Sequence, residues 1–341
     1  MLATKVSIES HDRYMRIAVI IPYFQREPGI LRQALLSVLH QKDILPSTVI
    51  VIDDSSPQPA EPEVLALPSH LYERITLLHQ LNAGPGAARN RGLDSVPPDT
   101  EAVVFLDSDD CWLPDHLKRA TTALSRGFDF YFSNYFDIDA TEGGFSNQGL
   151  LDTTLHQPLD IPADTYAYVG DIRTQILGRC PIETSTVAFR WDIFKQLRFR
   201  SDFRDAYEDL LFWFELTSLT SKVVFSAQVE CRYGRGVNIF RGGTWGTEAS
   251  LKRLVASTRF KTNIRKRFPL TNEQHWLVEE GRKRNRRALT SEILHRVRHL
   301  KPMLWRHLWL YFKADPIVAL SLLPEIVTQL LKKPNTRLAS R

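Results

Sequence analysis

The chain has 341 residues, of which 43% are hydrophobic, 24% charged and 10% aromatic, a composition typical of a soluble globular protein. This length suffices for one large domain or for a domain with an appendage. The three cysteines are far apart and odd in number. They provide neither a disulfide framework nor a zinc spacing, so we expect a reducing compartment.

Charge is distributed unevenly along the chain. Of the 44 Lys and Arg and 39 Asp and Glu, 21 and 6 lie from Leu251 onward, which leaves 23 and 33 in the first 250 residues. The net charge of +5 therefore combines an acidic body with a basic C-terminal segment. The N-terminus lacks the apolar run of a secretory signal, and no window of about 18 uncharged apolar residues occurs, so we expect no transmembrane helix.

The first half alternates β-rich runs with helical patterns. Continuous apolar strands separated by helices of about a dozen residues predict an α/β fold with a mainly parallel sheet covered on both faces. In such sheets ligands bind beyond the carboxyl ends of the strands. We expect strands at 16–24, 47–56, 74–80, 101–110 and 128–139, and helices at 29–41, 84–96 and 113–127.

The second half is less regular. Residues 140–180 are predicted to be a variable loop region, and 234–246, with their glycines, a mobile loop that could close over a ligand. From Glu248 the chain is predicted to be helical and basic. We therefore expect a catalytic body of residues 1–247 and a C-terminal helical region of residues 248–341. Between them we expect a strand and helix start at 184–194, a helix at 205–218 and a strand at 222–235.

The strand at 101–110 ends in three aspartates. Asp107 and Asp109, two positions apart, can direct both carboxylates at one point, and such oxygen ligands suit Mg²⁺ or Mn²⁺ carrying phosphate groups. The alternative is a solvated acidic turn. A divalent cation would supply the positive partner that clustered carboxylates such as Asp107, Asp109 and Asp110 need.

Two further aspartates, Asp53 and Asp54, follow the apolar residues VIVI near the end of the strand predicted at 47–56. Neighbouring strand residues point in opposite directions, so one should face a ligand and the other the body. A carboxylate facing a ligand could accept hydrogen bonds from a base or a ribose. The alternative is an aspartate that caps a helix or a turn.

The glycine-rich segment 82–92 invites comparison with nucleotide-binding loops. Arg89 stands where a dinucleotide-binding loop has its third glycine, and no P-loop lysine follows. What remains is a turn into a helix N-terminus with Arg89 and Arg91, which is compatible with an anionic ligand. A surface helix with solvated arginines is the alternative.

Glu208 and Asp209 begin an apolar helical segment. Carboxylates at this position can simply complement the helix dipole. The functional interpretation is a general base that takes a proton from an attacking hydroxyl group.

Six motifs occur together and in a fixed order: VIIPYF, VIDDSS, NAGPGAARNRG, FLDSDDCW, TSTVAFR and YEDLLFWFEL. In this order they resemble family 2 glycosyltransferases of the GT-A fold, over roughly residues 16–235, about two-thirds of the chain. The resemblance implies a Rossmann-like, mainly parallel sheet flanked by helices, and a transferase that uses a nucleotide-sugar.

The resemblance also implies roles on the donor side. Pro22 and Phe24 would pack against the nucleotide base, and Asp54 would bind the edge of that base. Asn82 and Arg89 would lie near the ribose and the phosphates.

For metal binding and catalysis, the resemblance points to the two acidic motifs. Asp107 and Asp109 match the D-x-D motif, with Asp109 the direct ligand of Mn²⁺ or Mg²⁺. Asp209 would be the catalytic base and Glu208 its neighbour.

The implied reaction is an inverting single displacement from a nucleotide-sugar, most simply a UDP-sugar, to a hydroxyl of a glycan or lipid-linked acceptor in surface polysaccharide or glycoconjugate synthesis. The Q-x-x-R-W signature of processive synthases is absent, so we expect one sugar per encounter. The alternatives are a sugar nucleotidyltransferase and a non-catalytic, membrane-associated protein that binds nucleotide-sugars.

Large apolar residues are interspersed among the basic residues of the C-terminal region. Trp305, Leu308, Trp309 and Phe312 have the spacing of an apolar helical stripe, and Pro324 is expected to break the helical pattern. These helices either pack on the body or lie in the headgroup layer of an anionic membrane. We expect peripheral attachment to the cytoplasmic face and no nucleic-acid partner.

Overall fold

The protein is described by a computed structural model covering residues 15–160, 162–204, 206–237 and 244–331. Within these residues the strands join in a single sheet with the order β3-β2-β1-β4-β9-β6-β10-β8-β7, and β5 pairs with β10. The strands are β1 (Ile17–Tyr23), β2 (Thr48–Asp53), β3 (Ile75–His79), β4 (Ala102–Phe105), β5 (Cys111–Trp112), β6 (Phe130–Phe136), β7 (Gln157–Leu159), β8 (Thr165–Ala167), β9 (Ala188–Arg190) and β10 (Val223–Arg232).

The sheet is mixed, and its N-terminal half is parallel. Strands β3, β2, β1 and β4 pair in parallel, as do β6 and β10. Strand β9 runs antiparallel between β4 and β6. The predicted α/β class is confirmed, and the parallel half brings the ends of β1, β2 and β4 to one edge of the sheet.

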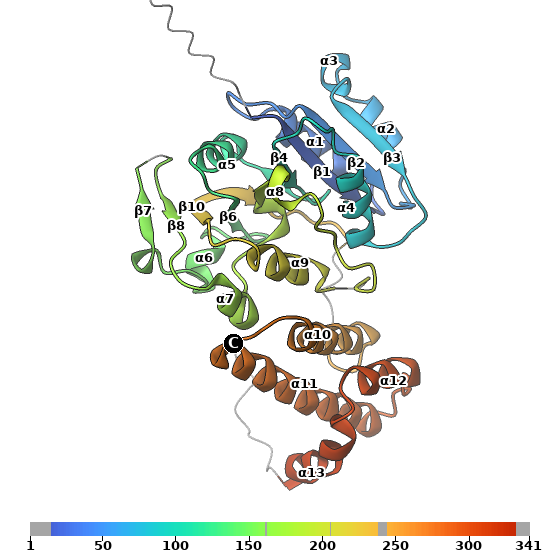
Figure 1. Ribbon diagram of the computed structural model, residues 1–341. Helices are drawn as coiled ribbons and strands as arrows, with labels where there is room; N and C mark the ends of the chain where they lie inside the picture. The colour runs from blue at the N-terminus through green and yellow to red at the C-terminus, as the bar shows by residue number, and fades with distance from the viewer. Residues whose placement is uncertain (1–14, 161, 205, 238–243, 332–341) are drawn as a thin grey trace, which may run out of the picture.

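Helices cover both faces of the sheet, and a group of helices from the C-terminal part lies below it (Figure 1). They are α1 (Ile30–Leu39), α2 (Glu61–Leu65), α3 (Ser69–Tyr72), α4 (Pro85–Asp94), α5 (His116–Ser125), α6 (Gly144–Asn147), α7 (Ile172–Arg179), α8 (Trp191–Phe194), α9 (Glu208–Thr217), α10 (Glu248–Arg267), α11 (Asn272–Arg298), α12 (Trp305–Ala314) and α13 (Val318–Leu331).

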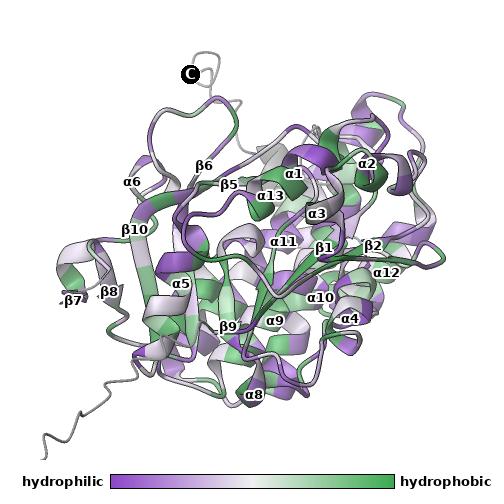
Figure 2. Cartoon of the chain, turned by 90° about the horizontal axis from the view of Figure 1, so that it is seen from above, coloured by the Kyte–Doolittle hydropathy of each residue, from purple (hydrophilic) through white to green (hydrophobic). Residues whose placement is uncertain are grey.

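Alternation along β1 explains why both faces must be covered. Ala18 and Ile20 belong to a core cluster that includes Leu211 of α9, whereas Val19 belongs to a second cluster with Leu31 of α1. Each fully buried aliphatic side chain contributes roughly 1.5–3 kcal/mol. In Figure 2 the hydrophobic colour is accordingly prominent in central strands such as β1 and β9.

The prediction of an irregular loop at 140–180 was wrong. This segment contains α6, the hairpin β7–β8 and α7. Asp171 caps α7 by accepting a hydrogen bond from the backbone N–H of Arg173, and Ile172 and Ile176 are buried in the core. An N-cap aspartate followed by apolar residues four apart is a helix signal that the glycine and threonine content of the segment obscured.

The predicted C-terminal helices are confirmed as α10–α13, although α13 continues across Pro324. A proline there removes one backbone hydrogen bond without ending the helix. Helices α10 and α11 pack on the body, where the ring of Phe260 stacks 5.4 Å from that of Tyr207 and Gln274 donates a 2.9 Å hydrogen bond to Asp171. No helix in the described part of the chain is long and apolar enough to span a membrane.

Candidate active site

A cleft lies at the carboxyl edge of the parallel strands. Its position follows from register, because Tyr23 at the end of β1 pairs with Asp53 at the end of β2. The cleft has a volume of about 510 Å³. It is lined by all nine residues to which the family resemblance assigns a role: Pro22, Phe24, Asp54, Asn82, Arg89, Asp107, Asp109, Glu208 and Asp209.

A buried arginine joins the two acidic motifs. The guanidinium of Arg89, from α4, lies 2.7 Å from Oδ1 of Asp107 and 3.0 Å from Oε1 of Glu208. It also lies 5.3 Å from the centre of the Phe199 ring. Arg89 is therefore a positive partner of these carboxylates within the chain itself. A role toward ribose or phosphate stays a prediction.

The Asp109–Asp110 turn is held by the segment that follows β10. Asp110 is buried; one carboxylate oxygen accepts a 2.5 Å hydrogen bond from Ser185 and the other a 3.0 Å bond from the N–H of Gly234. Burial, and then the charges of Asp109 and Asp107, raise the pKa of Asp110 well above its usual value. A Cβ on Gly234 would lie 1.5 Å from the carbonyl oxygen of Asp109, so only glycine permits this contact.

The aspartates after β2 both accept backbone hydrogen bonds. Asp53 accepts from the N–H groups of Ser56 and Ala60. Asp54 accepts from those of Ala83 and Gly84, each at 2.8 Å, and from the Gln80 side chain.

The Asp54 carboxylate thereby fixes the glycine-rich loop at the mouth of α4. A carboxylate has about four acceptor positions, so one remains for a ligand. The side chain of Asn82 in turn donates to the Asp54 carbonyl.

Glu208 and Asp209 differ in access. Glu208 is buried against Arg89, whereas Asp209 is half-buried at the cleft wall. Burial, followed by the charge of Asp209, raises the pKa of Glu208 to about 7. The pKa of Asp209 is also raised, first by burial, although Arg89 opposes the shift. Asp209 is thus the member of the pair that a substrate hydroxyl could reach.

The backbone just before this pair is strained. Tyr207 has φ 69°, in the left-handed region, which is unfavourable for a bulky residue. The structure holds it there because the Tyr207 ring stacks on Phe260 of α10. Helix α10 therefore helps to set where α9 begins, and with it the direction of Asp209.

Sequence reasoning missed several residues of the cleft. The most notable is Glu183, whose pKa is raised to about 7 by burial, with Asp209 and Asp107 adding to the shift while a hydrogen bond from Tyr233 opposes it. Arg204 is another; it donates to the carbonyl and the side-chain oxygen of Asn82, at 2.7 and 2.6 Å. Glu183 immediately precedes the TSTVAFR motif, but a single carboxylate without patterned neighbours gives little signal.

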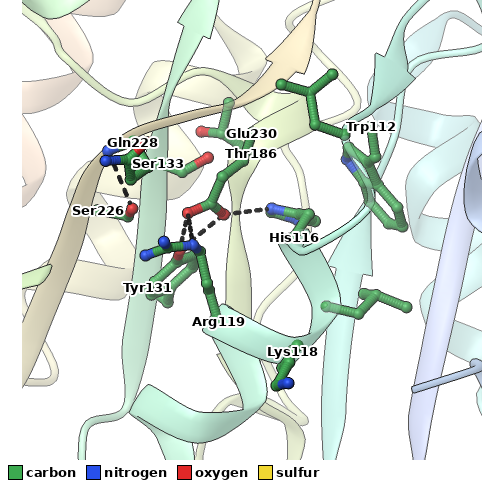
Figure 3. A network of polar contacts seen from close by, with 12 residues as sticks. Trp112, His116, Lys118, Arg119, Tyr131, Ser133, Thr186, Ser226, Gln228 and Glu230 are labelled. Atoms are coloured by element: carbon green, nitrogen blue, oxygen red, sulfur yellow. Dashed lines mark hydrogen bonds and ion pairs between the residues drawn. The ribbon is translucent and has the colours of Figure 1, made fainter. Parts of the chain in front are cut away.

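A second polar network joins β10 to neighbouring elements (Figure 3). The buried Glu230 carboxylate lies 2.9 Å from Nδ1 of His116 and 2.7 Å from the Tyr131 hydroxyl, which donates to it. The Trp112 ring lies tilted against that of His116, with 4.6 Å between their centres, and its N–H donates to the carbonyl of Ser185. The network thus connects α5, β6 and β10 to Ser185, the residue that holds Asp110.

The donor atoms of the cleft fit a divalent cation bound together with phosphates. Among the described residues, no three His, Cys, Asp or Glu side chains are arranged to hold a metal on their own. The Asp107 side chain is 36% exposed, and Asp109 lines the same cleft. Mg²⁺ and related ions commonly use one or two carboxylates and complete their coordination with substrate phosphates and water, so Asp107 and Asp109 are the residues that could hold such an ion.

Comparison with known proteins identifies the family to which this α/β chain belongs. The family described as "Glycosyl transferase family 2" matches residues 18–178. The succinoglycan biosynthesis protein ExoW of Rhizobium meliloti is 36% identical over 229 residues, which cover 66% of this chain and 70% of ExoW. The chain belongs to glycosyltransferase family 2, and the protein is a glycosyltransferase.

Solved structures agree on the fold. Staphylococcus aureus TarS 1–349, solved in complex with UDP, has a TM-score of 0.57 at 15% identity, over 96% of this chain and 95% of that one. The mannosyltransferase PcManGT from Pyrobaculum calidifontis, solved with GDP-Man and Mn²⁺, has a TM-score of 0.55 at 15% identity, over 96% and 89%. At this identity the similarity concerns the GT-A fold alone.

Proposed function

We propose that this glycosyltransferase moves a sugar from a nucleotide-sugar, most simply a UDP-sugar, to a hydroxyl group of a glycan or lipid-linked acceptor, with inversion at the anomeric carbon. The observation that carries the proposal is the convergence of all nine motif residues on one cleft. The similarity to ExoW, a succinoglycan biosynthesis protein, supports a role in making a surface polysaccharide or another glycoconjugate.

The donor is proposed to lie along the ends of β1, β2 and β4. The half-buried Phe24 ring would stack on the base, with Pro22 beside it. Asp54, fixed by the backbone of residues 83 and 84, would offer its remaining acceptor position to an N–H on the edge of the base. A uracil presents such a donor.

Asp209 is proposed as the general base. It lies at the cleft wall, whereas Glu208 is occupied by Arg89. Removing a proton from the acceptor hydroxyl as it attacks is worth about 10²–10⁴-fold in rate. Glu208 is proposed to position Arg89 and the start of α9.

Asp107 and Asp109 are proposed to hold Mn²⁺ or Mg²⁺. A divalent cation bound there would supply positive charge to the departing nucleoside diphosphate. Neighbouring residues hold the two carboxylates in position. Arg89 compensates part of the Asp107 charge, and the Gly234–Gly236 segment lies against Asp109.

Binding of UDP tests the proposal. We would titrate the full chain with UDP by calorimetry in Mn²⁺, in Mg²⁺ and in EDTA, and repeat the titration with Asp109→Asn. Metal-dependent binding that falls at least about tenfold in the variant is expected. Asp192→Asn, an exposed aspartate paired with Arg190, is the matched control and should bind UDP as the wild type does.

Two other results would change the proposal. Equal UDP affinity with metal and with EDTA would remove the cation from the donor site. Absence of UDP binding under every condition, with binding of GDP instead, would overturn the choice of a uridine donor.

We also propose that residues 248–341 attach the enzyme peripherally to an anionic membrane at the cytoplasmic face, while residues 1–247 carry the chemistry. The predicted stripe divides: Leu308 is buried, but Trp305 and Trp309 are 73% and 60% exposed. Lys313 lies 5.3 Å from the Trp309 ring. Exposed tryptophans beside basic residues suit the headgroup layer.

Vesicle binding tests this attachment. The variant with Trp305→Ser and Trp309→Ser should co-sediment with phosphatidylglycerol vesicles at least about threefold less than the wild type. Trp276→Ser, which changes a tryptophan of α11 that is 62% exposed, is the control. Equal sedimentation of the double variant and the wild type would remove the membrane role of α12.

A further inference from the structure

A second cavity adjoins the active-site cleft. It has a volume of about 300 Å³ and lies between α10, α12 and the segment before α9. Arg204 and Ala206 line both cavities. Ala206 and the proposed base Asp209 both line the first cleft, so the second cavity adjoins the part of that cleft that holds the base.

The described lining of this cavity is strongly basic. Its charged and titratable side chains are Arg204, Lys252, Arg259, Arg306, His307 and Glu248. Four of these are permanently charged cations, and a single carboxylate opposes them. A cavity with such an excess of positive charge attracts anions.

The partners of these cations leave much of the charge uncompensated. Lys252 and His307 share Glu248, at 3.0 and 3.6 Å. Arg204 bonds to neutral oxygens of Asn82. Arg306 forms no ion pair with any residue that the structure describes.

The remaining cation, Arg259, pairs with Asp202 at 3.1 Å. That aspartate also accepts from Arg200, so its single charge is shared between two arginines. The pKa of Glu248 is lowered, first by the hydrogen bond from Lys252 and further by His307 and Arg306, which reflects the positive field around it.

We propose that this cavity binds a phosphate or diphosphate group of the acceptor substrate. Arginine and lysine side chains that converge from three elements match the several oxygens of a phosphate group, and an excess of about three positive charges matches a diphosphate better than a single carboxylate. The inference rests on the proposed function, because it assigns the anion to the acceptor and leaves the donor diphosphate at Asp107 and Asp109.

Arg204 gives this arrangement a geometric consequence. It bonds to Asn82 of the donor-side loop and lines the second cavity at the same time. An anion there would contact the side chain that fixes the donor loop, so occupation of the acceptor cavity should tighten donor binding.

The test is pyrophosphate binding to the full chain, measured by calorimetry with the donor site saturated by UDP and Mn²⁺. One pyrophosphate is expected to bind the wild type. The variant with Lys252→Gln and Arg306→Gln should bind it at least about tenfold more weakly and keep its UDP affinity. The control variant carries Lys266→Gln and Arg265→Gln on α10, away from the cavity, and should behave as the wild type.

The outcomes separate this inference from the proposed function. Pyrophosphate binding that is absent in the UDP-saturated enzyme, or equal in the wild type and the Lys252/Arg306 variant, overturns the anion site. If UDP fails to bind at all, the proposed donor site fails. Pyrophosphate binding in EDTA that still depends on Lys252 and Arg306 would then support the anion site independently.

A final arm identifies the source of the phosphate group. An isoprenyl diphosphate in detergent micelles is compared with free pyrophosphate on the wild type and the Lys252/Arg306 variant. Tighter binding of the isoprenyl compound, lost in the variant, supports the site and assigns it to a lipid-linked acceptor. Equal or weaker binding, also lost in the variant, supports the site and assigns it to a soluble phosphorylated acceptor.

Discussion

In both the active-site cleft and the C-terminal helices, one buried charge is paired with two charges of the opposite sign. The buried charge is positive in the cleft and negative in the helices. In the cleft, one buried arginine, Arg89, contacts two carboxylates, Asp107 and Glu208. In the helical region, one buried carboxylate, Asp315, contacts two arginines, Arg282 and Arg286, at 2.8 and 2.7 Å. Burying a charge is costly unless it is paired, and each region meets that requirement locally.

The two regions differ in the sign of the excess charge among the side chains that line their cavities. The cleft is lined by more carboxylates than arginines, and this composition favours a cation. The cavity beside α10 and α12 has an excess of arginine and lysine, which calls for an anion. The net charge of the side chains that line a site, rather than its ion pairs, therefore indicates whether the site binds cations or anions.

The largest effect is expected when the proposed base is removed. Asp209→Asn keeps the volume of the side chain but removes its basicity, so the rate of donor cleavage should fall about 10²–10⁴-fold. Release of the nucleoside diphosphate from a panel of UDP- and GDP-sugars measures this. UDP affinity should stay within a factor of about two to three, and a loss of activity below tenfold would assign the base elsewhere.

Removing the central arginine of each region compares the two directly. Arg89→Met leaves Asp107 and Glu208 without their cation and should cost roughly 3–5 kcal/mol of unfolding free energy. Arg282→Met should cost only about 1.5–3 kcal/mol, because Asp315 keeps Arg286. Urea unfolding measures both.

Added Mn²⁺ sharpens this comparison. It should restore part of the unfolding free energy lost in Arg89→Met, because the two freed carboxylates line the cleft. It should restore none of the unfolding free energy lost in Arg282→Met. Equal losses in the two variants would contradict the proposed difference between the regions.

A smaller effect is expected from crowding the acidic turn. In Gly234→Ala the added Cβ would collide with the Asp109 carbonyl, so the backbone must move and release Asp110. We expect a loss of about 1–3 kcal/mol and weaker UDP binding in Mn²⁺. Gly178→Ala, with no atom within 4 Å of the added Cβ, should be neutral or stabilising.

The sequence predicted the parallel half of the fold and several cleft residues at the ends of its strands, although not Tyr23. It could do so because strand ends in a parallel sheet share one edge, and motif order identifies which strands these are. The sequence did not predict the ion pairs. Arg89 contacts Asp107, 18 positions away, and Glu208, 119 positions away, and nothing in a single sequence couples positions so far apart.

The same limit explains the other omissions. Ser185 and Gly234 hold Asp110 across 75 and 124 positions, and neither residue type stands out in its own segment. Glu183 stands out only in the folded protein, because its raised pKa arises from burial beside carboxylates on other elements. Local pattern thus predicted which residues line the cleft but not which charges compensate one another.

The smallest expected effect is on the pH dependence of stability, which reports the excess of carboxylates in the cleft. Glu183 and Glu208 have pKa values raised to about 7 in the folded protein, above the roughly 4.3 of an unfolded chain. Between these values the folded state binds more protons than the unfolded state, so stability falls as pH rises from about 5 to 8.

Glu183→Gln should therefore flatten this decline by about 1 kcal/mol between pH 5 and 8, measured by urea unfolding without metal or nucleotide. Glu142→Gln, at an exposed position, should leave the slope unchanged. Mn²⁺ with UDP should also reduce the decline, because a bound cation compensates the charges that the protons otherwise neutralise. A slope insensitive to both Glu183→Gln and Mn²⁺ would mean that the cleft carboxylates are already balanced, and the contrast with the basic helical region would then no longer hold.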